Sequence, residues 1–351
     1  MVVRAHLFCR VVDNFGDAGI AWGLACGLIR DAQMGVTLFI DDLETLAALA
    51  PDYGETPGVQ VEQDRCAADW AGPPADIVIE ILSGTAPESY QERAADRPTP
   101  PVWMIYEYLS AEPWVETCHL KPSPHPRLNL PRFYFYPGFT NKTGGLLYDP
   151  KDVETCDPLM RTARPNLTIG LFCYENPLIP ALLDAFQATP RAMDLHVPAG
   201  IVTPQVSAYL ATQTAQGNMQ VYLDPFVPKE KFPRYIAGND INFVRGEDSL
   251  TTAVILETPV IWHIYPQDDG AHLVKLAAFC ALFTADMGAD AARAFTEMNF
   301  AWNGVGDVAQ AWLLYLAFLP EIKAQARDFG QNCRENGPAP KNLVDFCRKV
   351  R

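Results

Sequence analysis

Residues 13–19 read DNFGDAG and place two carboxylates and two glycines on one short segment. The segment stands between an apolar run typical of a buried strand and an apolar sequence at helical spacing, and open α/β sheets bind ligands at such strand ends. Gly16 and Gly19 would let the backbone turn and approach a ligand closely. Asp13 and Asp17 could then serve as a general base and as a group that orients an acceptor. The alternative is structural, with Asp17 capping the following helix and Asp13 stabilising the turn.

A second segment, RGEDS at residues 245–249, stands at the end of a predicted strand and the start of a predicted helix. Free backbone N–H groups and the positive end of a helix dipole suit a pyrophosphate at such a position. Arg245 could neutralise phosphate charge, and Ser249 could donate to a phosphate oxygen. Glu247 and Asp248 would repel a phosphate unless they point elsewhere, for example toward sugar hydroxyls. An acidic capping turn is the alternative interpretation.

Two aromatic residues of the second half, Tyr174 and Phe226, each follow a predicted strand. A nucleobase stacks on an aromatic face, so both are candidates for holding a nucleotide, although an aromatic residue beside a strand end is also common in a plain core. Residues 262–272, WHIYPQDDGAH, add amide and carboxylate groups after another strand, Gln267 and Asp268 among them. We expect this segment to line a sugar pocket or to cap the next helix.

The excess of acidic residues limits the classes of partner that the chain can bind. The chain has 42 acidic and 27 basic residues and a formal net charge of -15. Such a chain repels a phosphate backbone and an anionic lipid surface, so neither nucleic acid nor a membrane is expected as a partner. The same acidity would accommodate a cationic acceptor, although it could also serve solubility alone.

The nine cysteines are odd in number, and no pair has C-x-x-C spacing. This usage predicts reduced, buried thiols rather than disulfides or a zinc site. The N-terminal sequence lacks the pattern of a secretory leader, and no apolar run approaches membrane-spanning length. We therefore expect a cytoplasmic protein.

The elements that must position these residues alternate between strand and helix in both halves of the chain, which predicts two α/β domains with parallel sheets. A proline-dense stretch and a turn-rich segment separate the halves, and from residue 270 onward the chain is predicted to be helical. This layout is compatible with the GT-B fold, although the pattern alone leaves other pairs of doubly wound domains open. The predicted strands are residues 6–12, 36–40, 59–63, 76–81, 102–109, 133–139, 167–174, 193–198, 219–226, 240–245 and 259–266.

Six long segments, taken together and in order, resemble one family. The segments are VVDNFGDAGIAWGLA, IYEYLSAEPWVE, FYPGFTNKTGGLL, LFCYENP, NFVRGEDSL and WHIYPQDDGAHLVKL. They are similar to the EarP family, the protein-arginine rhamnosyltransferases of bacterial translation elongation factor P. The resemblance runs from about residue 6 to residue 280, and the remaining helical part is similar in character more than in motif.

The resemblance implies an α/β protein of the GT-B fold, with two Rossmann-like domains facing a central cleft. The acceptor domain would span residues 1–158 and the nucleotide-sugar domain residues 159–351, with the last helix packing back on the first domain. The implied donor is dTDP-β-L-rhamnose, and the implied acceptor is one arginine at a loop tip of elongation factor P. The reaction would invert the anomeric centre and use neither a metal nor a cofactor.

The family's catalytic aspartates fall on Asp13 and Asp17, and we take Asp17 as the general base. Asn14, Phe15 and Gly16 would border the sugar and the acceptor. Gln267 and Asp268 lie in a matching motif without an assigned role. The residues on which the donor contacts would fall are Tyr174, Phe226, Arg245, Glu247, Asp248 and Ser249.

The sequence departs from the family pattern at two places. Lys229 follows PFVP where the family usually has glutamine, so the selectivity for the donor base is open. Ala21, Trp22 and Gly23 replace a Cys-Trp-Arg type sequence, which removes a basic group. Two alternative functions follow: an inverting GT-B transferase with another nucleotide sugar or acceptor, and a non-catalytic acidic protein that binds a basic partner.

Overall fold

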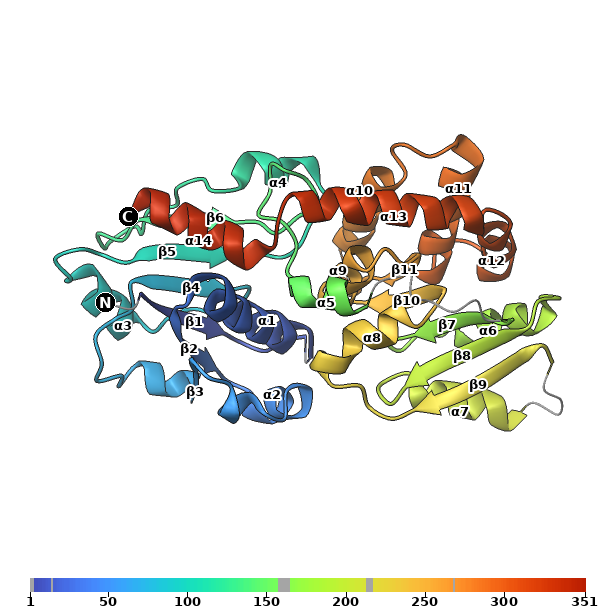
Figure 1. Ribbon diagram of the computed structural model, residues 1–351, viewed down its shortest axis with the longest axis horizontal. Helices are drawn as coiled ribbons and strands as arrows, with labels where there is room; N and C mark the ends of the chain where they lie inside the picture. Colours follow the sequence, from blue (N-terminus) through green and yellow to red (C-terminus); the bar gives the residue numbers. More distant parts are fainter. Residues whose placement is uncertain (1–2, 14, 157–164, 213–216, 268) are drawn as a thin grey trace. The chain divides into compact units, whose positions relative to one another are not determined.

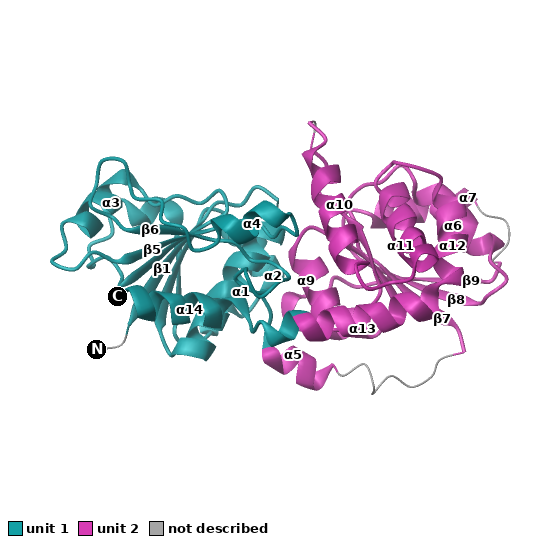
Figure 2. Cartoon of the chain, turned by 90° about the horizontal axis from the view of Figure 1, so that it is seen from above, with its two compact units in different colours: residues 1–149, 333–351 teal, residues 150–332 magenta. Residues whose placement is uncertain are grey.

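The computed structural model describes residues 3–13, 15–156, 165–212, 217–267 and 269–351. The chain forms two compact units (Figure 2), the first made of residues 1–149 and 333–351 and the second of residues 150–332. The domain boundary predicted between residues 158 and 159 falls outside the described residues. Within the described ranges, no helix is both long and apolar enough to cross a membrane.

The first unit is built on a six-stranded parallel sheet with the order β3-β2-β1-β4-β5-β6. β1 lies between β2 and β4, where Leu7 is paired with Leu38 on one side and with Ile79 on the other. β4 is buried along its whole length, which explains why four of its five residues are isoleucine or valine. The fifth, Glu80, is buried and accepts a hydrogen bond from the Ala86 N–H. The strands are β1 (Arg4–Cys9), β2 (Gly35–Ile40), β3 (Val59–Gln63), β4 (Ile77–Ile81), β5 (Val102–Tyr106) and β6 (Arg132–Phe135).

Helices cover this sheet, and one of them comes from the far end of the chain. α1 (Phe15–Ala32) packs against α14 (Ala339–Val350), as Figure 1 shows. Their close approach depends on Gly27, because a Cβ at that position would overlap the ring of Pro340. The other helices of the unit are α2 (Leu43–Leu49), α3 (Glu88–Ala95) and α4 (Pro113–Cys118).

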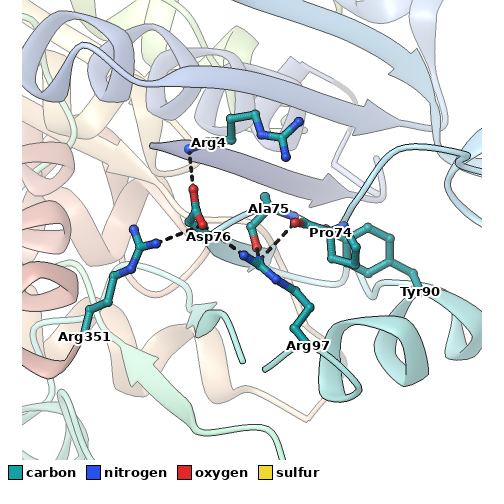
Figure 3. A network of polar contacts seen from close by, with 7 residues as sticks. All are labelled: Arg4, Pro74, Ala75, Asp76, Tyr90, Arg97 and Arg351. Carbon is teal, nitrogen blue, oxygen red and sulfur yellow. Dashed lines mark hydrogen bonds and ion pairs between the residues drawn. The ribbon is translucent and has the colours of Figure 1, made fainter. Parts of the chain in front are cut away.

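The C-terminal residue is bound at the amino ends of the strands of this sheet. Asp76, just before β4, accepts hydrogen bonds from the Arg4 backbone N–H at 3.1 Å, from Arg97 at 3.1 Å and from Arg351 at 2.9 Å (Figure 3). These donors hold the pKa of the Asp76 carboxyl below its usual range, against the opposing effect of burial. The network therefore ties α14 to β1 and β4.

The second unit repeats the design with a five-stranded parallel sheet in the order β11-β10-β7-β8-β9. Its core is rich in large aromatic side chains, among them the fully buried Trp302 and Trp312. The strands are β7 (Leu167–Leu171), β8 (Met193–Pro198), β9 (Met219–Asp224), β10 (Ile241–Arg245) and β11 (Val260–His263). The helices are α5 (Pro150–Thr155), α6 (Ile179–Ala188), α7 (Thr203–Thr212), α8 (Phe232–Ala237), α9 (Asp248–Ile255), α10 (Ala271–Phe283), α11 (Ala289–Trp302), α12 (Val308–Ala317) and α13 (Leu319–Glu335), the last of which continues into the first unit.

Each sheet has a point at which the strand order reverses, between β1 and β4 in the first unit and between β7 and β10 in the second. Ligands of doubly wound sheets bind at the carboxyl ends of the strands at such points. The predicted strands were too long at this edge: β1 ends at Cys9 rather than residue 12, and β11 at His263 rather than residue 266. Apolar residues continue past both ends, but Val12 is 64% exposed and therefore belongs to a loop.

Candidate functional site

The carboxylate of Asp17 holds the loop that follows β1. Its Oδ2 atom accepts hydrogen bonds from the backbone N–H groups of Val12 at 2.7 Å and Asp13 at 2.9 Å. Asp17 lies in the first turn of α1 and is 3% exposed. The contacts run back to the loop that precedes α1, so Asp17 fixes this loop from the first turn of the helix.

Asp13 is the more accessible of the two aspartates, and its position depends on Gly16. The Asp13 carbonyl accepts the Gly16 N–H at 2.7 Å, which closes a turn. The Asp13 carboxylate lies against the Gly16 Cα, because a Cβ there would come within 2.7 Å of Oδ2. Asn14 lies outside the described residues, and Phe15, which begins α1, is half-buried and packs against the core. The absence of a side chain at Gly16 therefore leaves room for the Asp13 carboxylate.

Replacement of Gly16 by alanine is expected to displace the Asp13 carboxylate and to lower turnover by about tenfold or more, since small misplacements of catalytic groups are costly. Donor affinity should stay near wild type. Steady-state kinetics with each substrate varied in turn would measure both values. Gly35→Ala is a matched control, because a Cβ there would make one ordinary contact, at 3.9 Å. Unchanged turnover in Gly16→Ala would contradict a role for the position of Asp13.

The loop after β4 lies directly against the end of β1. Gly84 donates its N–H to the Ile81 carbonyl at 2.8 Å, and a Cβ on Gly84 would overlap the Phe8 carbonyl. Leu82 has a φ of 55°, an uncommon value for a residue with a side chain. Sequence reasoning missed this glycine, because a lone glycine after a strand is an ordinary turn signal. It brings the loop after β4 to the switch point that carries Asp13 and Asp17.

In the second unit, the turn between β10 and α9 is closed by its own side chains. Gly246 has a φ of 55°, and its carbonyl accepts the Trp262 Nε1–H at 2.7 Å. The Ser249 hydroxyl accepts the Arg245 N–H at 3.0 Å and donates to the Arg245 carbonyl. Ser249 is 4% exposed, so its hydroxyl shapes the turn here.

The side chain of Arg245 rests on aromatic rings from a neighbouring strand end. Its guanidinium lies 4.5 Å from the ring centroid of Phe172 and 5.2 Å from that of Tyr174, both just after β7. Tyr174 meets His263 edge-on at 5.5 Å and Tyr265 at 5.4 Å. Burial, followed by the positive charge of Arg245, lowers the pKa of His263 to about 4, so this imidazole is neutral near pH 7. The ends of β7, β10 and β11 thus form one cationic and aromatic group.

The two acidic residues of the segment are neutralised by lysines. Lys275 on α10 pairs with Glu247 at 2.6 Å, and Lys229 pairs with both oxygens of Asp248 at 2.6 and 2.7 Å. The expected repulsion of phosphate by these acids is therefore offset by an equal number of cations. Because Lys229 follows β9, its pairing also shows that the loop after β9 crosses to the start of α9.

The remaining candidates lie on loops. Phe226 is 40% exposed on the loop that leads from β9 to Lys229, so its ring can meet a ligand. Gln267 is exposed after β11, and its backbone N–H donates to His272 Nδ1 at 3.1 Å. Asp268 lies outside the described residues. Tyr174, Arg245, Glu247, Asp248 and Ser249 thus come together at the start of α9.

Removal of the Lys229 charge is expected to weaken donor binding about tenfold, since Lys229→Gln leaves the Asp248 carboxylate uncompensated where phosphate would bind. The double variant Lys229→Gln/Asp248→Asn should recover part of that loss, since the repelling charge is then gone. Calorimetric titration with the nucleotide sugar would give the three dissociation constants. Additive losses in the double variant would show that the pair is not coupled at the binding site.

Comparison with known proteins identifies relatives along the whole chain. Residues 5–348 match the family model of the Elongation-Factor P (EF-P) rhamnosyltransferase EarP. A protein-arginine rhamnosyltransferase of Pseudomonas putida is 36% identical over 369 aligned positions, which cover 97% of this chain and 98% of the relative. One from Pseudomonas aeruginosa is 33% identical over 367 positions, covering 97% of each.

Solved structures agree. One described as "Structural basis for EarP-mediated arginine glycosylation of translation elongation factor EF-P" matches with a TM-score of 0.67 and 26% identity, covering 99% of both chains. MurG of Acinetobacter baumannii matches with a TM-score of 0.55 and 12% identity, covering 99% of this chain and 100% of that one, which shows the shared fold alone. The predicted GT-B fold class and the predicted enzyme class are confirmed. Since the family model spans nearly the whole chain, and relatives above 30% identity align along 97% of it, the chain belongs to the EarP family of rhamnosyltransferases.

Proposed function

We propose that this enzyme transfers L-rhamnose from dTDP-β-L-rhamnose to one arginine of translation elongation factor P, with inversion and without a metal or cofactor. The observation that carries the acceptor chemistry is the pair of carboxylates at the switch point of the first sheet, with Asp13 partly exposed and Asp17 buried and hydrogen-bonded to the backbone of Val12 and Asp13. The relatives named above are protein-arginine rhamnosyltransferases, which supports the same acceptor here.

Arginine is a difficult nucleophile because its guanidinium is protonated at every physiological pH. An enzyme that glycosylates it must orient the group, offset its charge and accept a proton. We assign the first two tasks to Asp13, which would bind the guanidinium through charge-assisted hydrogen bonds. Asp17 would accept the proton as the nitrogen attacks the anomeric carbon. Because Oδ2 of Asp17 already accepts two backbone N–H groups, Oδ1 is the oxygen that we assign to the proton.

The second unit would hold the donor. The departing dTDP gains negative charge as the glycosidic bond breaks, and preorganised donors that stabilise such charge contribute much of an enzyme's rate. Arg245, held over two aromatic rings, and the backbone N–H groups at the start of α9 are suited to this task. Phe226, exposed on the neighbouring loop, is the side chain that we assign to the nucleobase.

Mass spectrometry of elongation factor P after incubation with enzyme and dTDP-β-L-rhamnose tests the proposal. We expect the mass of one deoxyhexose residue to be added at a single arginine, and none when that arginine is replaced by lysine. Parallel reactions with UDP- and GDP-sugars test other donors. These donors are included because Lys229 replaces the usual glutamine and leaves the selectivity for the donor base open. Absence of an adduct with dTDP-rhamnose, together with one from another nucleotide sugar, would refute the donor assignment. Acceptor binding without any transfer would instead favour a binding protein.

A further inference from the structure

The residues that lead from β1 to Asp13 are held by a third carboxylate, that of Asp41. We call residues 10–13 the β1 loop; it follows Cys9, and Asp13 is its last residue. The Asp41 Oδ1 atom accepts the backbone N–H of Val11 at 2.8 Å. Asp41 is 30 positions from Val11 in the chain, so only the folded sheet brings the two together.

Asp41 is placed beside the β1 loop by the pairing of β1 with β2. The two strands are parallel neighbours in the sheet, and their last paired residues are Cys9 and Ile40. Asp41 is the next residue after Ile40, so its side chain supplies an acceptor where the main-chain pairing has ended. Asp42, which follows, caps α2 by accepting the Thr45 N–H at 2.9 Å. Asp41 is therefore fixed from both directions, by a strand before it and by a capped helix after it.

Three successive backbone N–H groups of the β1 loop are bound by carboxylates. Val11 donates to Asp41, whereas Val12 and Asp13 donate to Asp17 Oδ2 at 2.7 and 2.9 Å. Hydrogen bonds to a charged acceptor are shorter and roughly twice as strong as those between neutral groups. Asp41 and Asp17 thus hold the loop from two different elements, the end of β2 and the first turn of α1.

The side chains of the β1 loop show where the chain leaves the core. Val11 is half-buried and packs against the core of the first unit, whereas the side chain of Val12 points into solvent. Val11 is therefore anchored twice, by its side chain in the core and by its backbone on Asp41. Because Asp13 is only two residues further on, a displacement of Val11 would be passed to the Asp13 carboxylate.

The two anchoring carboxylates approach the same buried thiol. Cys9 is 2% exposed at the end of β1, and its thiol donates to the Asp17 carbonyl at 3.8 Å. Burial, followed by the negative charges of Asp17 and Asp41, raises the pKa of the Cys9 thiol, so the thiol stays neutral. Both charges are therefore close to Cys9, and both anchors act at the point where the β1 loop begins.

We propose that Asp41 is a positioning residue for rhamnosyl transfer: with Asp17, it fixes the β1 loop so that the Asp13 carboxylate stands where the acceptor guanidinium binds. The inference rests on the proposed function, because it takes Asp13 as the group that binds the guanidinium. A reacting group that is held in place before the substrate arrives gives a rate advantage that a mobile group loses. Asp41 contacts the backbone of Val11, so it acts through the loop.

Kinetics of Asp41→Ala and Asp41→Asn test this inference. We expect Asp41→Ala to lower kcat/KM for the acceptor protein about tenfold. The dissociation constant for the nucleotide sugar should stay at the wild-type value, because the second unit would hold the donor. Asp41→Asn should recover most of the loss, since its amide oxygen can still accept the Val11 N–H. A loss in Asp41→Asn as large as that in Asp41→Ala would overturn the proposal, because the charge of Asp41 would then be needed for itself.

Hydrogen exchange at valine amides gives a readout that does not depend on turnover. In enzyme made with isotopically labelled valine, Asp41→Ala should speed exchange at Val11 about tenfold or more, since this amide loses a charged acceptor. Asp41→Asn should restore most of the protection. Unchanged exchange at Val11 in Asp41→Ala, with adduct formation by wild type intact, would overturn the inference and leave the proposed function standing. If wild type itself forms no adduct, the proposed function fails and the positioning role fails with it.

A matched control separates positioning from stability. Asp307→Ala removes a carboxylate that caps α12 in the second unit, where it accepts the Ala309 and Gln310 N–H groups at 2.9 and 3.1 Å. This variant should lower the unfolding temperature and leave kcat and both KM values near wild type. If Asp307→Ala lowers kcat/KM for the acceptor as much as Asp41→Ala does, the effect of Asp41 is one of stability alone, and the positioning role is overturned.

A double variant tests whether Asp41 acts through Asp13. Once Asp13→Ala has removed the carboxylate, the position of the β1 loop matters little for the guanidinium. Asp13→Ala/Asp41→Ala should therefore turn over within about twofold of Asp13→Ala, because residues that act as one unit are not additive. A further loss as large as that of Asp41→Ala in the wild-type background would show that Asp41 acts independently of Asp13 and would overturn the proposal.

Discussion

Replacement of Asp17 by asparagine should lower kcat by about 10²- to 10⁴-fold, the usual contribution of a general base, and leave donor binding nearly unchanged. The physical reason lies in the two hydrogen bonds at Oδ2. An asparagine amide oxygen can still accept the N–H groups of Val12 and Asp13, so the loop keeps its shape. The amide cannot accept a proton from the attacking guanidinium. Single-turnover kinetics with saturating donor would isolate this step.

Two further variants decide whether Asp17 is a base or only an anchor. Asp17→Ala removes both the proton acceptor and the anchor, so it should lose turnover and also lower the unfolding temperature. Asp13→Asn keeps the anchor and weakens the hold on the guanidinium, so it should raise the acceptor KM more than Asp17→Asn does. If Asp17→Asn turns over like wild type while Asp17→Ala is inactive, Asp17 holds the loop and the proton goes elsewhere.

Replacement of Arg245 by alanine should raise the dissociation constant for the nucleotide sugar roughly 30- to 1000-fold, a loss of about 2–4 kcal/mol. The guanidinium is held over Phe172 and Tyr174 before any ligand arrives, so little ordering cost is left when phosphate binds. Its loss would also remove a positive charge from the start of α9 and shift the local charge toward the negative charges of Glu247 and Asp248. Isothermal titration calorimetry with the donor gives the affinity directly.

The variant Arg245→Lys distinguishes the contribution of the positive charge from that of the planar guanidinium. Lys keeps the positive charge but lacks the flat guanidinium that stacks on a ring and binds two oxygens at once, so Arg245→Lys should recover only part of the affinity. Arg93→Ala is the matched control, because Arg93 also lies over a tyrosine, at 5.9 Å from the Tyr90 ring, in the first unit. Equal donor affinity in wild type and Arg245→Ala would remove Arg245 from the phosphate site.

Much of the fold could be predicted from the sequence, because its signals are local. Apolar runs bounded by glycine, proline and aspartate mark the strands, and each of the eleven predicted runs overlaps a strand of the structure. The carboxyl ends were harder to place. Apolar residues continue beyond β1 and β11, but the pairing stops at Cys9 and His263, where the neighbouring strands also end, and a linear pattern does not show where neighbouring strands end.

The candidate site, like the fold, could be predicted from the sequence only in part. The sequence by itself determined which residue types stand at which strand ends: two aspartates after β1, an aromatic residue after β7, and an arginine at the end of β10 with two acids after it. It also determined the family, since long motifs in fixed order are specific. Both features depend only on residues that lie close together in the sequence.

Tertiary structure alone decided what the side chains do. Lys229 meets Asp248 and Lys275 meets Glu247 only because strand order brings distant loops to one sheet edge. The same packing buries Asp17 and brings Gly84 of the loop after β4 against Phe8 at the end of β1. Burial and charge compensation arise from contacts between segments far apart in sequence, and no local pattern encodes which of those contacts will form.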